Sequence, residues 1–555
     1  MSALERRTQS LALFCVVAMT LVVTPWMNLD PINLPKFLIL VVSGFALLGN
    51  FVPFLSKLEL STIRLLTIFA LVFVFGLLLS LFTSGADINS QLYGAYGRNT
   101  GFLAYFSLAV ISIGIAFVSS HDFVRKLILA LIFTGTFNAI YGLAQWADLD
   151  PFTWNSSYSP IIGTLGNPNF ISAHLGMATL ASMSLLLGLG TSLLSRALLL
   201  FNIILFLFVI YQSDSSQGLL ISALGATVVF YYRFVDRLRL KLLKSLYWCV
   251  VSGMALVGAF GTLNRGPLAS FLYQDSVTFR GDYWRAGWKM TLDNPLFGVG
   301  LDSYGGWYRF SRSEAAALRR GPDVTSNSAH NVFLDISSNG GFFLLISYLL
   351  IISLVIRSAV RVLRKPGGFD SVSVGLVSSW LAYLVQSVIS INQLGLAIWG
   401  WVLGGAIIGY DLYKDRPDLV QGRRKTGKQV EQVPPSLVLT GTLGLVIGIV
   451  VSIWPVIQDV SFRAALESGD GIQVERVTDK FPRSGYYYIY AGQIFQENNL
   501  EEKALKMARL AIEVNPRDFI AWELLAANSK ISQEERDAAI AKMRELDPFN
   551  NTLGK

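Results

Sequence analysis

The sequence has 555 residues, of which 53% are hydrophobic and only 15% are charged, and its formal net charge is +8 at pH 7. Soluble domains carry about 25% charged residues. Here the apolar residues fall in blocks of about 17–22 residues, long enough to cross a bilayer core of about 30 Å. This composition excludes an ordinary soluble protein. We also expect no nucleic-acid partner, because the basic residues cluster between the apolar blocks and do not gather on one folded face.

The apolar blocks predict an all-α polytopic membrane protein with about 12–13 transmembrane helices. The first block follows Glu5-Arg6-Arg7, and no small-x-small cleavage motif stands near Thr24-Pro25-Trp26. We therefore interpret it as a transmembrane helix and not as a signal peptide. The predicted spans are residues 11–29, 36–55, 63–82, 101–119, 124–144, 170–190, 196–212, 217–232, 245–263, 335–356, 371–390, 394–413 and 436–457.

The basic residues between the spans predict their orientation. With the N-terminus in the cytoplasm, nearly every cluster of Lys and Arg falls in an inner loop, as the positive-inside rule requires. Arg98 is the exception among the short outer loops. Residues 264–334 form one long outer loop, to which the rule does not apply. An odd number of spans also places the C-terminal region outside, in the periplasm.

Changes in composition divide the chain into parts. Residues 1–413 form the polytopic domain, and 414–435 form a basic, proline-containing linker that we expect in the cytoplasm. The last span, 436–457, leads to a charged and helical region at 459–555. We predict a small α-helical repeat domain there, on the outer side of the membrane.

Positions 34 residues apart suggest that this region resembles a tetratricopeptide repeat. Tyr488 and Trp522 have this spacing, and so do Pro482 and Pro516. Within one unit, five residues match the repeat: Gly492, Phe495, Ala504, Ala511 and Pro516. The neighbouring units are degenerate. The region is either a docking surface for a protein partner or acceptor, or a helical cap without a ligand.

The cysteines and two of the three histidines show no functional pattern. Cys15 and Cys249 both lie inside apolar blocks, so neither a disulfide framework nor a metal site is expected. His121 lies in an inner loop and His174 in a span, where structural roles are favoured. His330 is the only histidine expected on the outer face.

Two short outer segments and the outer end of a span pair carry unusual polar residues. Arg98 lies in a glycine-rich turn before the span at 101–119, where it either binds an anion or extends to the membrane surface. Asn167 and Asn169 precede the span at 170–190, where a helix cap is favoured over a sugar contact. The segment 213–218 joins two further spans.

The long outer loop is the richest in reactive residues. If residues 280–292 are helical, Arg280, Trp284 and Trp288 share one face, at spacings of four residues. Arg285 and Lys289 then share a different face. One face would meet a phosphate group and the other would meet lipid head groups.

Together these segments resemble the O-antigen ligase and O-antigen polymerase superfamily. Its hallmark is an arginine followed by Trp-Arg-Ala, then Asn-Pro-Leu-x-Gly-x-Gly and His-Asn-x-x-Leu. Here these motifs are Arg280, Trp284-Arg285-Ala286, Asn294-Pro295-Leu296-Phe297-Gly298-Val299-Gly300 and His330-Asn331-Val332-Phe333-Leu334. The likeness covers residues 90–340, and the spans extend it to about residue 413.

The resemblance implies a membrane glycosyltransferase of the GT-C type in a bacterial inner membrane. Such enzymes take a glycan from undecaprenyl pyrophosphate on the periplasmic face. They transfer it to lipid A core, to a growing glycan or to a protein hydroxyl, and neither a nucleotide sugar nor a metal cofactor is implied. The expected partners are therefore the lipid-linked glycan, a lipid or protein acceptor, and membrane lipids.

The residues suit this chemistry. The leaving pyrophosphate gains negative charge, which fixed arginines stabilise. His330 would accept the acceptor's proton or orient the acceptor, since its ordinary pKa is about 6.5; Asp282 is the alternative base. A single displacement would invert the anomeric centre. We predict His330 and Arg280 as catalytic residues, no metal ligands, and six substrate-binding residues: Arg98, Arg285, Asn167, Asn169, Trp284 and Asn331.

One position departs from the family pattern. Many members have Ser-Arg-Gly in the segment at 213–218, where the arginine is thought to hold pyrophosphate. This chain has Ser216-Gln217-Gly218. One cationic contact would then be missing, and Arg98, Arg285 or Arg265 would have to compensate.

Three other functions stay open on the sequence alone. The first is a polymerase that joins repeat units by the same chemistry. The second is a bicarbonate-like small-anion transporter, which should show broken helices or paired ionisable residues at mid-membrane. The third is a scaffold in which only the outer repeats matter. The abundance of Arg in the outer loop favours chemistry at the surface over conduction.

Overall fold

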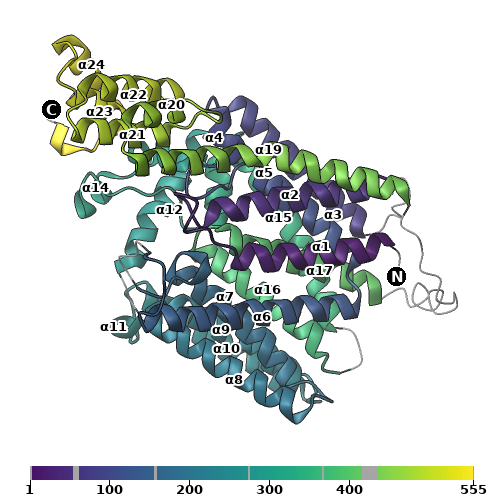
Figure 1. Cartoon of the computed structure of the whole chain (residues 1–555). Coiled ribbons are helices and arrows are strands. Elements are labelled where there is room, and N and C mark those ends of the chain that lie inside the picture. Colours follow the sequence, from purple (N-terminus) through teal and green to yellow (C-terminus); the bar gives the residue numbers. More distant parts are fainter. Residues whose placement is uncertain are drawn as a thin grey trace.

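The computed structural model describes residues 3–53, 62–154, 159–272, 275–364, 368–414 and 434–553. This part of the chain contains helices and no strands. Long helices run side by side along one direction, and a smaller group of C-terminal helices lies beyond one end of them (Figure 1). We call this end, which also carries residues 264–272 and 275–331, the loop end of the bundle.

Each of the thirteen predicted spans overlaps a helix, which confirms the all-α polytopic architecture, although the first helix ends at Leu21 and not near residue 29. Among the described residues, ten helices are long and apolar enough to cross a membrane. They are α2 (Asn33–Phe51), α3 (Thr62–Thr83), α6 (His121–Trp146), α8 (Leu193–Gln212), α9 (Ser216–Phe230) with the π-helical segment η3 (Tyr231–Val235), α10 (Lys241–Thr262), α15 (Val332–Arg364), α16 (Ser371–Ile389), α17 (Leu394–Lys414) and α19 (Pro435–Ser468).

Three predicted spans fall on helices outside that set of ten. Helix α1 (Ala3–Leu21) begins with charged residues. Helix α5 (Phe102–Val118) has 17 residues, which is about 25 Å at 1.5 Å per residue. Helix α7 (Pro168–Leu186) carries serines and His174 and is buried along most of its length. Its polar residues lie inside the protein, so α7 does not need the apolar surface of a lipid-facing helix.

The core of the bundle depends on small residues that let helices approach closely. A Cβ atom at Gly444 would lie 2.3 Å from the carbonyl oxygen of Phe45, and one at Gly49 would lie 2.2 Å from that of Thr440. Gly444 and Gly448 form a Gly-x-x-x-Gly motif, the pattern with which membrane helices pack backbone against backbone. Helix α19, which is otherwise mostly exposed, is therefore fixed to α2.

Helix α19 continues into the C-terminal region without a break. The predicted boundary between the last span and the outer region, at 457–459, lies inside this 34-residue helix. Most of the predicted linker, residues 415–433, lies outside the described residues. The helices that follow are α20 (Gly471–Thr478), α21 (Gly485–Glu497), α22 (Glu501–Val514), α23 (Phe519–Ala527), α24 (Gln533–Leu546) and the turn η4 (Asn551–Leu553).

Two helix pairs form most of this C-terminal region. Helices α21 and α22 pack together, and so do α23 and α24. A Cβ atom at Gly492 would lie 2.3 Å from Leu524, so the absence of a side chain lets the two pairs pack against each other. The helical character of the region is observed, whereas the tetratricopeptide assignment stays a prediction.

Two buried carboxylates join the C-terminal helices to the rest of the molecule. The Asp459 carboxylate accepts hydrogen bonds from Asn28, Tyr96 and Tyr487, among others. At the other side, Asp547 accepts from Arg309 and Arg312 of the long loop, at 2.7–3.0 Å. The C-terminal helices are therefore tied both to the start of the chain and to the loop.

Candidate functional site

The long loop is largely helical. It contains α11 (Ala269–Leu272), α12 (Asp275–Asp293), α13 (Tyr304–Ser311) and α14 (Glu314–Arg320). The predicted helix at 280–292 is thus confirmed within α12. Trp288, on the predicted face, is 46% exposed and packs its ring edge against Phe342.

The Asn294–Gly300 motif docks α12 onto a break in α15. Gly341 has φ +69°, so the α-helical hydrogen bonds stop there. The carbonyl oxygens of Ser338 and Asn339 instead accept from the N–H groups of Val299 and Gly300, at 2.8 and 3.1 Å. Backbone groups inside a protein require such partners. The motif therefore has a structural role, because it satisfies the broken helix and fixes the loop to it.

A small hydrogen-bond network places His330 just before α15. Its backbone has φ +52°, and its N–H donates to the Ser328 hydroxyl at 3.0 Å. That hydroxyl donates to Asp335 at 2.7 Å, and Asp335 also accepts from the N–H of Ala329 at 2.8 Å. Asp335, which lies in the first turn of α15, therefore fixes the turn that presents the imidazole.

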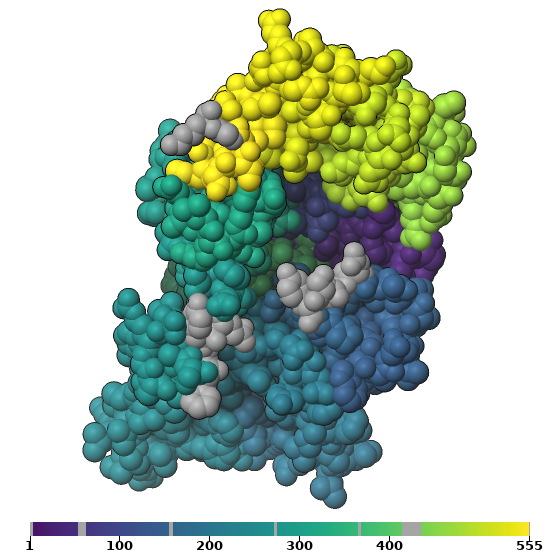
Figure 2. All heavy atoms as spheres, turned by 90° about the vertical axis from the view of Figure 1, so that its left-hand side faces the viewer, coloured from purple at the N-terminus to yellow at the C-terminus, as the bar shows by residue number. Residues whose placement is uncertain are grey.

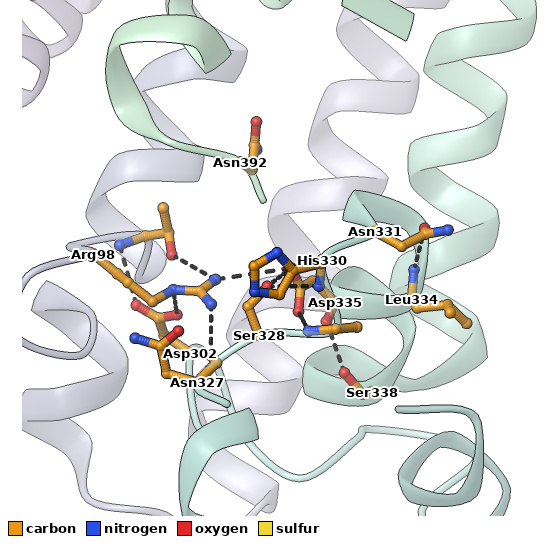
Figure 3. A network of polar contacts seen from close by, with 12 residues as sticks. Arg98, Asp302, Asn327, Ser328, His330, Asn331, Leu334, Asp335, Ser338 and Asn392 are labelled. Carbon is orange, nitrogen blue, oxygen red and sulfur yellow. Dashed lines mark hydrogen bonds and ion pairs between the residues drawn. The ribbon is translucent and has the colours of Figure 1, made fainter. Parts of the chain in front are cut away.

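Arg98 completes this network from the opposite side (Figure 3). Its guanidinium lies 3.0 Å from Asp302 and 3.9 Å from Asp335, and it donates to the carbonyl oxygen of Asn327 at 2.5 Å. Its side chain is 7% exposed. Two buried carboxylates already neutralise this charge, so the geometry favours a positioning role for Arg98 over direct binding of pyrophosphate.

The imidazole of His330 is available for chemistry. Its ring stacks on Tyr283, with centroids 5.2 Å apart, and its nitrogens have no hydrogen-bond partner among the described residues. Burial, together with the positive charges of Arg280, Arg98 and Arg320, lowers the pKa of His330 to about 4. At neutral pH the ring is therefore uncharged and able to accept a proton.

Arg280 is a cation beside this histidine that lacks a counter-ion among the described residues. Within the described part of the chain it makes neither a hydrogen bond nor an ion pair. Burial lowers its pKa, but arginine still carries its charge at neutral pH. An anion would therefore gain an unopposed guanidinium at this point. Arg320 lies nearby, with its guanidinium on the Phe279 ring at 3.9 Å and a hydrogen bond to the Tyr283 hydroxyl.

The other predicted loop residues are engaged in different ways. Arg285 is 62% exposed and pairs with the buried Asp282, which also pairs with Arg319. Two arginines thus hold the carboxylate proposed as an alternative base. Trp284 has a buried indole N–H without an acceptor in the described residues. The Asn331 side chain caps α15 by accepting from the N–H groups of Phe333 and Leu334.

The two remaining predicted residues belong to a second polar cluster, at the start of α7. Asn167 caps this helix by accepting from the N–H of Asn169 at 2.9 Å. Asn169 accepts from Ser215, just before α9, at 2.8 Å. Gln217 is 5% exposed, and neither atom of its amide has a partner in the described residues. No hydrogen bond between described residues joins this cluster to His330 or Arg280.

Comparison with known proteins supports an O-antigen ligase relationship for the middle of the chain. The family model described as O-Antigen ligase matches residues 173–349. This is about a third of the chain, from α7 to the middle of α15. The matched range contains Gln217, Arg280 and His330 but not Arg98. No curated protein matches the chain.

The match supports the O-antigen ligase superfamily, whose members are membrane glycosyltransferases, and ligase-like glycan transfer in general. Such a reaction uses a lipid-linked glycan and an acceptor. The apolar helices and the match fit a multi-pass protein of a bacterial inner membrane.

Several residues of the site were not singled out from the sequence. Arg320 lies next to His330 in the structure, and the Arg319-Arg320 pair before Gly321 was its only signal. Asp302 and Asp335 lie in the motif-bearing loop, but their pairing with Arg98 joins residues more than 200 positions apart. Local spacing carries no information about such contacts.

Proposed function

We propose that the loop end faces the periplasm and transfers a glycan from undecaprenyl pyrophosphate to an acceptor hydroxyl, as an O-antigen ligase does. The observation that carries this proposal is the juxtaposition of Arg280, a cation without a counter-ion, and His330, an uncharged imidazole without a hydrogen-bond partner in the described residues. The reaction needs a cation that stabilises the anionic leaving group and a base that accepts the proton of the acceptor hydroxyl.

In the proposed reaction the acceptor oxygen attacks the anomeric carbon, and its proton passes to the His330 imidazole. The bond from that carbon to the pyrophosphate oxygen breaks, and the electron pair leaves with undecaprenyl pyrophosphate. Arg280 stabilises the charge that develops on this leaving group. A single displacement inverts the anomeric configuration, and no metal is required for any of these roles.

The arginines also tune the histidine. Without a donor, burial and the positive charges of Arg280, Arg98 and Arg320 keep the pKa of His330 low. A bound pyrophosphate offsets these positive charges, so the pKa of His330 rises when the donor arrives. The imidazole would therefore become a stronger base only once the leaving group is in place. Without the donor, it would seldom be protonated by the solvent.

The polymerase alternative uses the same chemistry and differs only in its acceptor. The transporter alternative draws on two observations, the break in α15 and the buried Lys36. The break is satisfied by Val299 and Gly300, and the Lys36 ammonium donates to the carbonyl oxygen of Val22 at 2.8 Å. Both features thus have structural partners, so we favour surface chemistry.

Transfer in liposomes tests the proposal. The vesicles would contain the full chain, undecaprenyl-pyrophosphate glycan and a host envelope extract as acceptor. We expect glycan transfer with release of undecaprenyl pyrophosphate, lost in Arg280→Ala and in His330→Ala. Arg476→Ala, an exposed arginine on α20, and His121→Ala, a half-exposed histidine on α6, are matched controls that should retain activity.

The opposite result is equally clear. If the wild type releases no undecaprenyl pyrophosphate while the same vesicles accumulate bicarbonate, the enzyme proposal is wrong and the transporter replaces it. If transfer persists in both site variants, the roles of Arg280 and His330 are wrong.

A further inference from the structure

A cavity of about 660 Å³ lies at the end of the bundle that is opposite to the loop end. Figure 2 shows the loop end, where the yellow C-terminal helices lie beside the teal long loop. The cavity lies at the other end of the helices, between η3, the first turns of α10, the end of α15 and the segment that leads into α16. Its volume is within the range of about 300–1,000 Å³ that is typical of ligand sites.

Two arginines that line this cavity have no counter-ion. Arg237 follows η3, and Arg364 ends α15. Within the described part of the chain, neither guanidinium makes a hydrogen bond or an ion pair. Both residues are exposed, so a ligand can reach them. Two cations from distant positions in the chain therefore line one cavity without a carboxylate that holds them.

The two carboxylates in the wall of the cavity are held by other groups. Asp236 accepts a hydrogen bond from the Lys244 ammonium at 2.9 Å. Asp370 caps α16 and accepts from the Tyr410 hydroxyl at 2.9 Å. The acidic residues of the wall are thus engaged in fixing the helix ends. An anion in the cavity would meet guanidinium groups that no carboxylate occupies.

Aromatic rings form the side of the cavity next to α10. The Tyr231 ring lies 5.1 Å from that of Tyr232 and 5.0 Å from that of Trp248, measured between centroids. All three residues line the cavity. Tyrosine and tryptophan are enriched where membrane helices meet water, because they combine an apolar ring with a polar group. The rings therefore indicate that the cavity lies at the level of the lipid head groups.

Helix α10 offers an apolar surface beside the cavity. Across residues 241–262, all of which the structure describes, only Gly261 is buried. Leu242, Leu246 and Val250 are each more than half exposed, and their spacing of four residues places them on one face. Trp248, near the start of the helix, also lines the cavity. A molecule with a charged group in the cavity could thus lay apolar chains along α10.

The walls of the cavity are fixed by contacts that do not involve its two unpaired arginines. The Arg233 guanidinium donates to the carbonyl oxygen of Leu187 at 3.1 Å and lies 5.8 Å from the centroid of the Phe369 ring. The Tyr247 hydroxyl donates to the carbonyl oxygen of Thr227 at 2.7 Å. A preformed site loses less entropy on binding than a flexible one. Replacing the unpaired arginines should therefore leave the cavity intact.

We propose that this cavity binds the phosphate head group of an anionic phospholipid, whose acyl chains lie along α10. The planar guanidinium group pairs well with phosphate oxygens, and basic pockets between membrane helices bind anionic lipid head groups. A soluble phosphate compound could use the same arginines but would not cover the apolar surface of α10. The inference does not depend on glycan transfer at the loop end.

Retention of lipid by the full chain tests this inference. The chain is purified in a neutral detergent and incubated with phosphatidylglycerol or with phosphatidylcholine, and the lipid that stays bound is measured by mass spectrometry. The cavity variant combines Arg237→Gln with Arg364→Gln. The matched control combines Arg196→Gln with Arg239→Gln, which removes the same charge at the same end of the bundle from two exposed residues outside the cavity.

We expect the wild type and the control to retain phosphatidylglycerol in preference to phosphatidylcholine. The cavity variant should bind phosphatidylglycerol about tenfold or more weakly, because two charge-assisted contacts are lost. Arg237→Lys combined with Arg364→Lys keeps both charges and should retain most of the binding. Phosphatidylglycerol should also raise the unfolding temperature of the wild type and the control, but not that of the cavity variant.

Four results would overturn the inference. The first is equal retention of phosphatidylglycerol by the wild type and the cavity variant. The second is an equal loss in the cavity variant and the control, which would reflect general attraction to a basic surface. The third is displacement of the lipid by inorganic phosphate, which would assign the cavity to a soluble phosphate compound. The fourth is a lower unfolding temperature of the cavity variant in phosphatidylcholine, which would give its arginines a structural role.

Discussion

Two groups of arginines in the long loop differ in one respect, the presence of a counter-ion. Arg312 is 1% exposed and forms two hydrogen bonds to Asp547, which also binds Arg309. Arg280 is partly buried but has no acidic partner among the described residues. The same residue type therefore serves as a fixed structural joint in one place and as a candidate anion site in the other.

This difference between the two groups determines the role that we assign to Arg98. By sequence it resembles the candidate anion-binding arginine Arg280, because the sequence predicts it in a glycine-rich turn outside the membrane. By structure it belongs with Arg312, because Asp302 and Asp335 neutralise it. Counter-ions, and not position in a motif, separate the two groups.

The largest expected effect, a loss of stability, comes from removing the contact of Asp547 with Arg309 and Arg312. Asp547→Ala leaves Arg309 and Arg312 without their carboxylate, and unpaired buried charges of this kind cost about 3–5 kcal/mol. We expect a lower unfolding temperature and faster proteolysis of residues 459–553. Asp537→Ala, on the exposed face of α24, is the control and should change neither. Equal unfolding temperatures of both variants would contradict the role of Asp547 in fixing the C-terminal helices to the long loop.

Arg98→Leu should act in the same way, with a loss of about 3 kcal/mol, because Asp302 and Asp335 remain buried and unpaired. Unfolding temperature and glycan transfer should fall together. A variant that keeps its stability but loses donor binding would instead restore Arg98 to the pyrophosphate site.

Arg280→Ala should lower kcat by about a hundredfold, equivalent to about 2.7 kcal/mol, by removing a cation from the leaving group. The unfolding temperature should stay near that of the wild type, because no partner is left unpaired. Arg280→Lys keeps the positive charge but lacks the planar guanidinium, so its kcat should lie between that of the wild type and that of Arg280→Ala. If Arg280→Ala lowers the unfolding temperature but not kcat, Arg280 has a structural role like that of Arg309 and Arg312.

Arg320→Gln should change the pH dependence. Since Arg320 helps to lower the pKa of His330 to about 4, its removal moves that pKa up toward the ordinary value of about 6.5. The neutral imidazole is the active form, so kcat/KM rises as pH increases through this pKa. The rise should occur at higher pH in the variant. Identical profiles would mean that His330 does not titrate in the reaction.

Arg285→Ala should have the smallest effect, within a few-fold of wild-type activity. The residue is 62% exposed, and Arg319 still neutralises Asp282 when Arg285 is lost. Pairs exposed to this degree contribute about 0–1 kcal/mol. The rate of glycan transfer at saturating donor measures the activity of this variant. A hundredfold lower rate would show that Arg285 binds the pyrophosphate directly.

Part of the site was predictable because it follows from local sequence. The face shared by Arg280 and Trp284 needs only helical periodicity, and the Asn167 cap needs only an asparagine before a helix. The separation of the two polar clusters was not predictable. Asn169 lies in α7 and Gln217 in α9, two helices that pack together, while Arg280 and His330 lie in the long loop.

The sequence by itself determined the apolar spans, the long loop, the helical C-terminal region and the presence of ligase-type motifs. Each of these follows from hydrophobicity or from residues close together in the chain. Only the tertiary structure decided which arginines carry a counter-ion and where the cavity lies. Those properties depend on carboxylates brought together from distant positions, such as Asp302 with Arg98 and Asp547 with Arg312. Folding therefore decides which of the arginines at the loop end remain without a carboxylate partner and available to an anion.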